Sequence, residues 1–190
     1  MRKKHWTLGL FCLLAVIQIA VPVSMLVRRE ITLRTGKQFK FKVTSVDFSD
    51  AIPGRYVALS FKGDQVTLPE GMRIFEGQSV YALFENDENG FACFKSVSRM
   101  RPKGGNYIKA TVKKSGSKEA TLSLPFDRFY LEEEIAPPVR KACCKYSEEK
   151  KCSGFTTVRV KSGLAVLEEV YIDDLSIKDF IKKNIDRFEK

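Results

Sequence analysis

No Asp, Glu, Lys or Arg interrupts residues 5–27, and this apolar run decides more about the fold than any other part of the sequence. The run reads HWTLGLFCLLAVIQIAVPVSMLV. At about 1.5 Å per residue, a helix of this length spans roughly 30 Å or more, which is the thickness of the hydrocarbon core of a bilayer. The sequence therefore predicts a transmembrane helix over residues 5–27, in contact with the lipid bilayer and preceded by a basic tail at residues 1–4.

A cleaved signal peptide is the main competing interpretation of this run, and a buried helix of a soluble protein is a third. A signal peptide has an apolar region of about 7–15 residues, followed by a cleavage site with small residues. Here the run is longer, and cleavage after Ala20 would place Gln18 where a small residue is needed. Cleavage after Ser24 would place Pro22 at the same position. We therefore expect an uncleaved single-pass anchor.

Charge alone leaves the orientation of this anchor open. Basic residues flank both ends of the run: Arg2, Lys3 and Lys4 on one side, and Arg28, Arg29, Arg34, Lys37, Lys40 and Lys42 on the other. A simple count favours a cytoplasmic location for the second flank, but large domains are translocated largely regardless of charge. Together these arguments lean towards an N-terminus inside the cell and a domain outside it.

The chain beyond the anchor is large enough for one folded domain with a real core. Residues 28–190 hold 30 basic and 23 acidic residues, which is a net charge of +7 over 163 residues. An apolar content of 44% excludes a disordered chain, and five Cys in 190 residues exclude a disulfide-dense mini-protein. His5 is the single His, which removes almost all His-based catalysis and His-ligated metal sites.

The pattern changes from helical to extended at Gly36. Residues 28–36 extend the helix as a juxtamembrane linker, which Gly36 is suited to end. Phe39, Phe41 and Val43 then alternate with polar residues, which is typical of a strand with one buried face.

Three turn sequences predict β-hairpins in the rest of the domain. They lie at residues 86–90, 115–118 and 162–163, and each separates two stretches that alternate between apolar and polar residues. Residues 176–190 have apolar side chains at helical spacing. We expect a mainly β fold, with a compact antiparallel β domain at residues 37–190 that ends in a short helix.

Residues 46–61, VDFSDAIPGRYVALSF, resemble the motif after which the GDYXXLXY family is named. This is a family of bacterial membrane-anchored proteins of uncharacterised function. Two later segments look like further parts of the family pattern, RFYLEEE at 128–134 and VRVKSGLAVLEEVYID at 158–173. The first motif is carried by Gly54, Arg55, Tyr56, Leu59 and Phe61, and the second by Arg128, Tyr130 and Glu133.

This resemblance covers most of the chain and implies where the protein works. It implies a single anchor in the cytoplasmic (inner) membrane, with the domain in the periplasm or outside the cell. It also implies genes that often lie beside those of polytopic membrane proteins, so a polytopic partner is expected. It implies neither an established activity nor a cofactor.

The sequence departs from the family motif at two positions. Arg55 stands where the motif has Asp, and Phe61 stands where it has Tyr. Because a base replaces the acid and a hydroxyl is lost, neither position is a catalytic group in this chain. The motif residues that remain suit a tight turn that leads into a packed strand. The alternative is a functional motif, in which Arg55 and Tyr56 form an edge that docks a partner.

Carboxylates on either side of the two motifs offer a catalytic alternative. If Asp50 and Glu133 converged, they could form the acid/base pair of a membrane-tethered hydrolase that acts on an envelope substrate. Nothing in their spacing shows that they meet. The simpler interpretation is that Asp50 caps the turn and that Glu133 is solvated. An ion pair of Arg128 with either carboxylate is a further, structural role.

Three of the Cys residues lie close together in the chain. In an oxidising compartment, Cys143 or Cys144 could form a disulfide with Cys152 and close a short loop. Free thiols are the alternative. Zinc is the least favoured interpretation, because a structural zinc site needs four ligands and this cluster supplies three at unusual spacing.

A long basic stretch is the last candidate for binding. No acidic residue lies between Asn89 and Lys118. The basic side chains of this patch are Lys95, Arg99, Arg101, Lys103, Lys109, Lys113, Lys114 and Lys118. A solvated face is the default interpretation, and an anionic surface or polyanion is the functional one. Nucleic acid is an unlikely ligand, because Tyr107 is the only aromatic residue among the later charges.

We therefore predict a membrane-anchored accessory or interaction protein without enzymatic activity. The chain has no phosphate-binding loop, no dinucleotide-binding glycine motif and no G-x-S-x-G nucleophile motif. The alternatives are the hydrolase that uses Asp50 and Glu133, and a module that binds polyanions or an anionic surface.

Overall fold

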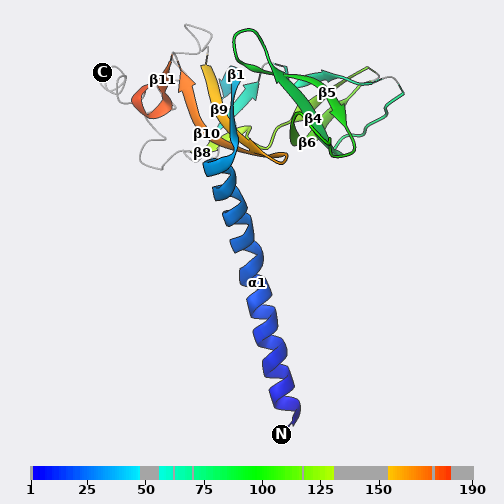
Figure 1. The fold of residues 1–190 in the computed structure, drawn as a ribbon, viewed down its shortest axis with the longest axis vertical. Coiled ribbons are helices and arrows are strands. Elements are labelled where there is room, and N and C mark those ends of the chain that lie inside the picture. Colours follow the sequence, from blue (N-terminus) through cyan, green and yellow to red (C-terminus); the bar gives the residue numbers. More distant parts are fainter. Residues whose placement is uncertain are drawn as a thin grey trace.

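The protein consists of a long helix that carries a β domain at its C-terminal end (Figure 1). A computed structural model describes residues 2–47, 56–61, 63–69, 71–116, 118–130, 154–172 and 174–180. The β domain is mainly antiparallel, as expected, and its last described residues, 177–180, are helical.

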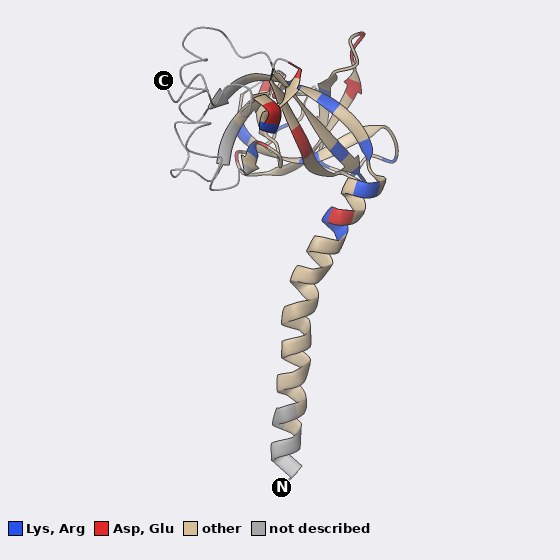
Figure 2. Cartoon of the chain, turned by 90° about the vertical axis from the view of Figure 1, so that its left-hand side faces the viewer, with Lys and Arg blue, Asp and Glu red and all other residues tan. Residues whose placement is uncertain are grey.

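Helix α1 (Arg2–Thr35) is a single uninterrupted helix of 34 residues. The most apolar 18-residue window of its segment Gly9–Thr35 has a mean hydropathy of 2.5, and none of that window is buried against the rest of the chain. By length and composition, this helix is long and apolar enough to cross a membrane. In the coloured part of α1 in Figure 2, charged residues are confined to the end next to the domain, where the sequence has Arg28, Arg29, Glu30 and Arg34.

Six strands form the first sheet, and every adjacent pair is antiparallel. The order is β11-β10-β9-β1-β2-β8. The strands are β1 (Lys37–Asp47), β2 (Tyr56–Phe61), β8 (Arg128–Tyr130), β9 (Gly154–Lys161), β10 (Leu164–Ile172) and β11 (Leu175–Ser176). The central strand β1 follows directly on the helix, so α1 enters the domain at the middle of this sheet.

Five strands form the second sheet, again with antiparallel neighbours, in the order β3-β7-β6-β4-β5. They are β3 (Gln65–Thr67), β4 (Ser79–Asn86), β5 (Ala92–Ser98), β6 (Asn106–Ser115) and β7 (Glu119–Ser123). The outer strands β3 and β5 lie against each other, which rolls the sheet towards a barrel. Two single bridges, Lys40↔Phe91 and Ile108↔Gly163, connect the two sheets.

All three expected hairpins are present. They are β4–β5, β6–β7 and β9–β10. In the β9–β10 turn, Ser162 and Gly163 have φ values of 53° and 84°. Two successive positive φ values give a turn whose twist matches that of the flanking strands.

Aromatic side chains fill the space between the two sheets. Phe41, which is 1% exposed, lies at the centre of the cluster. Its ring centroid lies 5.1 Å from that of Phe126, 5.5 Å from that of Phe84 and 5.6 Å from that of Phe94. Phe61 of strand β2 lies 6.4 Å away on another side. The alternation along β1 therefore does direct its phenylalanines into the core.

We expect Phe41→Ala to lower the free energy of unfolding by about 3–5 kcal/mol, because the vacated volume borders four other rings and cannot collapse. The matched control is Phe75→Ala, since Phe75 is 69% exposed. That change should stay within about 0.5 kcal/mol. Denaturant unfolding of the full chain in detergent micelles, followed by near-ultraviolet circular dichroism, measures both. Equal effects would show that the cluster is not the core.

Candidate functional site

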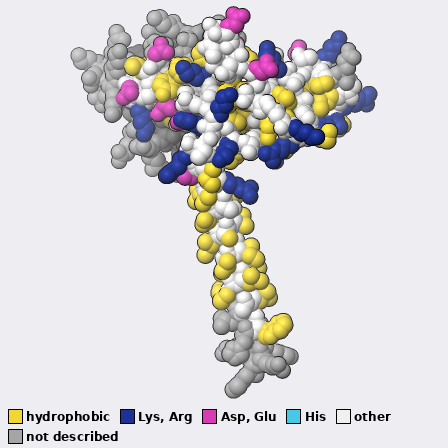
Figure 3. Space-filling view, viewed as in Figure 1, with side chains coloured by type: hydrophobic (Ala, Val, Ile, Leu, Met, Phe, Trp, Pro, Cys, Tyr) yellow, Lys and Arg dark blue, Asp and Glu magenta, His cyan; other side chains and the backbone are white. Residues whose placement is uncertain are grey.

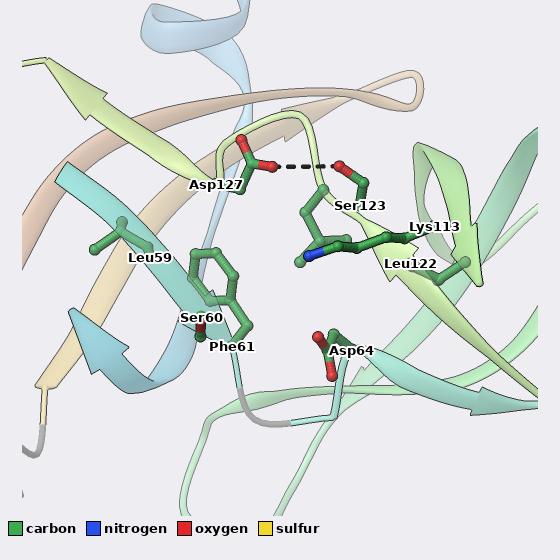
Figure 4. A pocket seen from close by; sticks show the side chains of 9 residues that line it. Leu59, Ser60, Phe61, Asp64, Lys113, Leu122, Ser123 and Asp127 are labelled. Carbon is green, nitrogen blue, oxygen red and sulfur yellow. Dashed lines mark hydrogen bonds between the residues drawn. The ribbon is translucent and has the colours of Figure 1, made fainter. Parts of the chain in front are cut away.

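A small polar pocket lies where the end of β2 meets β6 and β7 (Figure 4). Its volume is about 70 Å³. The lining residues are Leu59, Ser60, Phe61, Asp64, Lys113, Leu122, Ser123, Leu124 and Asp127. The pocket therefore draws on both sheets and on the turn that precedes β8.

Two residues of the family-like motif form the apolar wall of this pocket. Leu59 and Phe61 are each 5% exposed. The Leu59 backbone N–H donates to the carbonyl oxygen of Asp127 at 2.8 Å, which ties β2 to the turn before β8. Phe61 also packs on Phe126, with 5.1 Å between ring centroids. Phe61 is thus a core residue, and a tyrosine hydroxyl is not needed at this position.

The polar side of the pocket holds two carboxylates and an amine. The Ser123 hydroxyl donates to Asp127 Oδ2 at 3.2 Å. Lys113 extends across the pocket towards Asp64, which comes from the turn between β2 and β3 (Figure 4). Burial raises the pKa of Asp64 above its usual value of 3.8, while the positive charge of Lys113 and the backbone N–H groups of Asp64 and Gln65 act in the opposite direction.

The size of the pocket limits the chemistry that it can perform. Sites that bind organic ligands usually have volumes of about 300–1,000 Å³, several times larger than this one. A polar hollow of about 70 Å³ holds a few water molecules. Among the described residues, no three His, Cys, Asp or Glu side chains gather in a way that could hold a metal ion. The pocket therefore suits bound water better than a substrate.

The second notable site is the junction between α1 and the β domain. Thr32, near the end of the helix, is only 3% exposed, and Gly36 is buried. The Gly36 N–H donates to the Thr32 carbonyl oxygen at 2.8 Å. A Cβ atom on Gly36 would collide with that same oxygen and would lie 3.2 Å from the backbone nitrogen of Val160. Only glycine fits where the helix end meets strand β9.

Charged side chains hold this junction together. The Arg159 guanidinium forms an ion pair with Glu168 at 3.0 Å, and its Nη1 donates to the Gly36 carbonyl oxygen at 3.3 Å. Gln38 Nε2 donates to Glu168 Oε2 at 2.6 Å. The hydrogen bond from Arg159, more than that from Gln38, lowers the pKa of Glu168. Lys161 is a second cation at this junction, beside Arg159, because its Nζ donates to Thr35 Oγ1 at 2.6 Å. Positive charges near the C-terminus of a helix interact favourably with the helix dipole.

The structure brings together strands from the two motif segments. Strand β2 pairs with β8, and in this register Tyr56 lies opposite Tyr130 and Ala58 opposite Arg128. The remaining predicted residues of both motifs lie outside the described residues, as do the hydrolase carboxylates and the cysteine cluster: Gly54, Arg55, Asp50, Glu133, Cys143, Cys144 and Cys152. Cys12 and Cys93 are free thiols.

The predicted basic patch is spread over several elements. Lys95 is on β5, Arg99, Arg101 and Lys103 are on the β5–β6 connection, Lys109, Lys113 and Lys114 are on β6, and Lys118 precedes β7. All eight side chains are exposed. Lys113 belongs to the pocket, and Arg101 donates from its Nε to the Tyr107 hydroxyl at 2.8 Å. The eight basic side chains of the patch therefore lie in different structural environments.

Sequence reasoning missed the polar residues of the pocket and of the junction. Asp64, Ser123 and Asp127 meet only because β2, β7 and the following turn converge. Arg159 and Glu168 lie on the two strands of one predicted hairpin, which was a usable signal for their ion pair. Nothing local in the sequence indicates that this pair also reaches the helix end.

Comparisons with known proteins gave one match. A family model described as GDYXXLXY protein matches residues 18–170, from the second half of α1 to near the end of β10. Neither the curated proteins nor the solved structures contain a match.

We expect Asp64→Asn to raise the melting temperature slightly near pH 7. Because the folded state raises the pKa of Asp64, the protonated carboxyl is favoured in the fold, and the ionised form costs stability as the pH rises through that pKa. Asparagine is neutral at every pH, so the difference between the two proteins should vanish at pH values below about 3.8.

Thermal unfolding of both proteins from pH 3.5 to 7.5 measures this difference. Lys113→Gln is the companion variant, because it removes the charge that stabilises ionised Asp64. It should make the loss of stability with rising pH steeper. A difference between Asp64→Asn and the unchanged chain that does not depend on pH would contradict this account of the pocket.

Proposed function

Because this chain belongs to the GDYXXLXY protein family, we propose that it is a membrane-anchored accessory protein. In this proposal, α1 spans the membrane and holds the β domain against a membrane-protein partner, without enzymatic activity. The family itself has no characterised function, so the proposal is built on the helix and on the way in which the domain is attached to it.

The exposed apolar surface of α1 carries the proposal. Large side chains along its length are open to the surroundings, such as Leu13 at 57%, Ile17 at 49% and Leu26 at 66% exposure. In Figure 3, hydrophobic side chains cover the helix on the visible side. Exposing apolar surface to water costs about 25 cal/mol of free energy per Å², so the apolar side chains of this helix need an apolar environment. Lipid provides one for a span of this length.

The family resemblance supports an orientation with the N-terminus in the cytoplasm and the domain on the outer side of the cytoplasmic membrane. In a cell with two membranes, this places the domain in the periplasm. Large domains can be translocated despite the basic residues that precede β1, so the charge pattern permits this arrangement.

Anchoring gives such a domain a positional mechanism. A contact between two molecules in one membrane is effectively intramolecular, with effective concentrations that reach the millimolar range for short tethers. A weak domain–partner contact is then sufficient. The junction strengthens this effect, because Arg159, Lys161 and Gly36 connect the helix end to β9 without a flexible linker.

The β2–β8 pair is the surface that we propose for the partner. Within the described residues, β8 is the last strand of the first sheet, and a sheet edge can accept an added strand. Both family motifs meet in this pair, and Arg55 immediately precedes β2. Arg55 and Tyr56 are therefore the residues to change first.

The anchor is tested by placing arginines in the middle of α1. We expect the double variant Leu13→Arg and Ile17→Arg to be released from membranes by alkaline carbonate, whereas the unchanged chain stays in the pellet. Each arginine at a helix centre costs about 2.5–3.5 kcal/mol of insertion free energy.

The matched control is Val27→Arg, next to Arg28, where the side chain can reach the headgroups and should leave the chain in the pellet. Release of the unchanged chain would refute the anchor. The intact mass of the purified protein separates an anchor from a cleaved signal peptide, and a C-terminal alkaline phosphatase fusion, which is active only outside the cytoplasm, reports the orientation.

The partner is sought by crosslinking native membranes and purifying the full-length chain, with residues 1–36 alone as the anchor control. We expect a specific membrane protein that the double variant Arg55→Ala and Tyr56→Ala no longer retains. The matched control is Arg73→Ala with Phe75→Ala, an exposed basic and aromatic pair elsewhere, which should retain the partner. No protein above the anchor control would contradict the accessory role.

A further inference from the structure

We infer that the β domain makes a second membrane contact, in which its side next to α1 binds anionic phospholipid headgroups. This proximal face consists of Arg101, Lys109, Lys161 and Leu164, together with Met100. The inference rests on the proposed membrane-spanning role of α1. It adds a site for a lipid ligand on the folded domain.

Helix length places this face near the lipid. Arg28 follows directly on the apolar run, which puts it at the level of the headgroups. Thr35 is seven residues further on, which is about 10 Å along the helix axis. The headgroup layer on each side of a bilayer is about 5–7 Å thick, and charges interact over a Debye length of about 8–10 Å. The end of the helix therefore lies within reach of the headgroup charges.

The junction then holds one hairpin at this level. Lys161 Nζ bonds to Thr35 Oγ1 at 2.6 Å, so the β9–β10 turn begins beside the helix end. Figure 1 shows the turn of this hairpin on the side of the domain from which α1 leaves, and reaching sideways towards the second sheet. Because the attachment is rigid, the turn cannot move far from the membrane.

Direct contacts extend the face from this turn into the second sheet. The Lys109 backbone N–H donates to the Gly163 carbonyl oxygen at 2.9 Å. The Tyr107 ring packs so closely against Gly163 that a Cβ there would lie 2.8 Å from it. Arg101 in turn bonds to the Tyr107 hydroxyl at 2.8 Å. Arg101, Lys109 and Lys161 are thus linked through one chain of contacts.

The segments that supply the proximal face carry positive charge only. Residues 89–118 and 154–167, which supply the proximal face, contain no acidic residue. Figure 3 shows Lys and Arg side chains gathered along the side of the domain that faces down the helix. Among the described residues, two acids near the helix end are engaged in ion pairs, Glu168 with Arg159 and Glu30 with Arg34. A basic surface at this distance attracts an anionic leaflet.

Exposed apolar side chains lie among these charges. Leu164, directly after the β9–β10 turn, is 42% exposed, and Met100, next to Arg101 in the chain, is 79% exposed. Basic groups with interspersed apolar groups are the composition that binds at a lipid interface, where the charges meet phosphates and the apolar groups enter the acyl boundary. This combination favours lipid over a free polyanion as the ligand.

A tryptophan at the turn tests the contact. The chain has one Trp, Trp6, so Trp6→Phe combined with Leu164→Trp leaves a single indole, at the proximal face. The full chain is reconstituted in phosphatidylcholine vesicles that contain lipid brominated near the headgroup, with or without phosphatidylglycerol. We expect strong quenching of the indole with phosphatidylglycerol, weak quenching without it, and a loss of quenching in high salt.

Removing two charges should abolish the contact. Each basic residue near an anionic surface multiplies the contact equilibrium about fivefold, so Arg101→Gln with Lys109→Gln should reduce it roughly 25-fold and bring quenching to the level of neutral vesicles. The matched control is Lys40→Gln with Lys42→Gln on β1. The Nζ of Lys40 lies 5.4 Å from the centroid of the Phe155 ring, and that of Lys42 lies 6.0 Å from the centroid of the Phe91 ring, so neither belongs to the proximal face. Lys42 also lies about 16 Å along β1 from Lys37, the residue at which the strand leaves the helix end.

Vesicle flotation separates the failure of this inference from the failure of the anchor. A chain that floats with both vesicle types but shows no quenching with phosphatidylglycerol keeps its anchor and overturns the lipid contact. Equal quenching in the two vesicle types overturns it as well. A chain that floats with neither refutes the anchor. Hydrogen exchange of residues 161–164 in the unchanged protein is a second readout, and it should be slower in phosphatidylglycerol nanodiscs than in neutral ones.

Discussion

The meeting of a helix end with a sheet, at Gly36, sets the geometry of this molecule. The carbonyl oxygens in the last turn of a helix lack partners within the helix and must find them elsewhere. Here the β domain contributes one such partner, since Arg159 donates to the carbonyl oxygen of Gly36 just beyond the helix, and Thr32 is buried. Because no side chain fits at Gly36, the backbone of α1 comes directly against β9. The sheet, the β9–β10 hairpin and the proximal face all take their positions from this contact.

The elements of the β domain were largely readable from the sequence, because each hairpin is local. The alternation that includes Phe39 and Phe41 indicated the buried face of β1, and the Ser162-Gly163 turn indicated the β9–β10 hairpin. In contrast, β1 pairs with β9 over a separation of more than 100 residues, for example Phe41 with Thr156. Periodicity carries no information about such partners, so neither the sheet order nor the junction could be predicted.

The candidate sites were less predictable than the fold, for two physical reasons. The sequence groups Lys113 with the basic patch, but a register shift between Val112 and Lys114 interrupts β6 there, and Lys113 lines the pocket with Asp64. Such bulges leave little trace in a sequence. In addition, the pocket exists only where both sheets converge. Leu59 and Phe61 of the family motif form its apolar wall, but nothing in the motif indicates a pocket or the polar residues opposite.

Because α1 has no hinge at its C-terminal end, its length also determines the position and the rotation of the β domain. Each residue of an α-helix advances the chain by about 1.5 Å and turns it by about 100°. In the proposed membrane-anchored arrangement, the number of residues between the headgroups and Gly36 therefore sets the height of the domain above the membrane and its rotation about the helix axis. One residue more or fewer in residues 28–35 would point the β2–β8 edge in a different direction within the membrane plane. In the proposed arrangement, the length of residues 28–35 therefore matters to the proposed partner surface as much as the residues on that surface do.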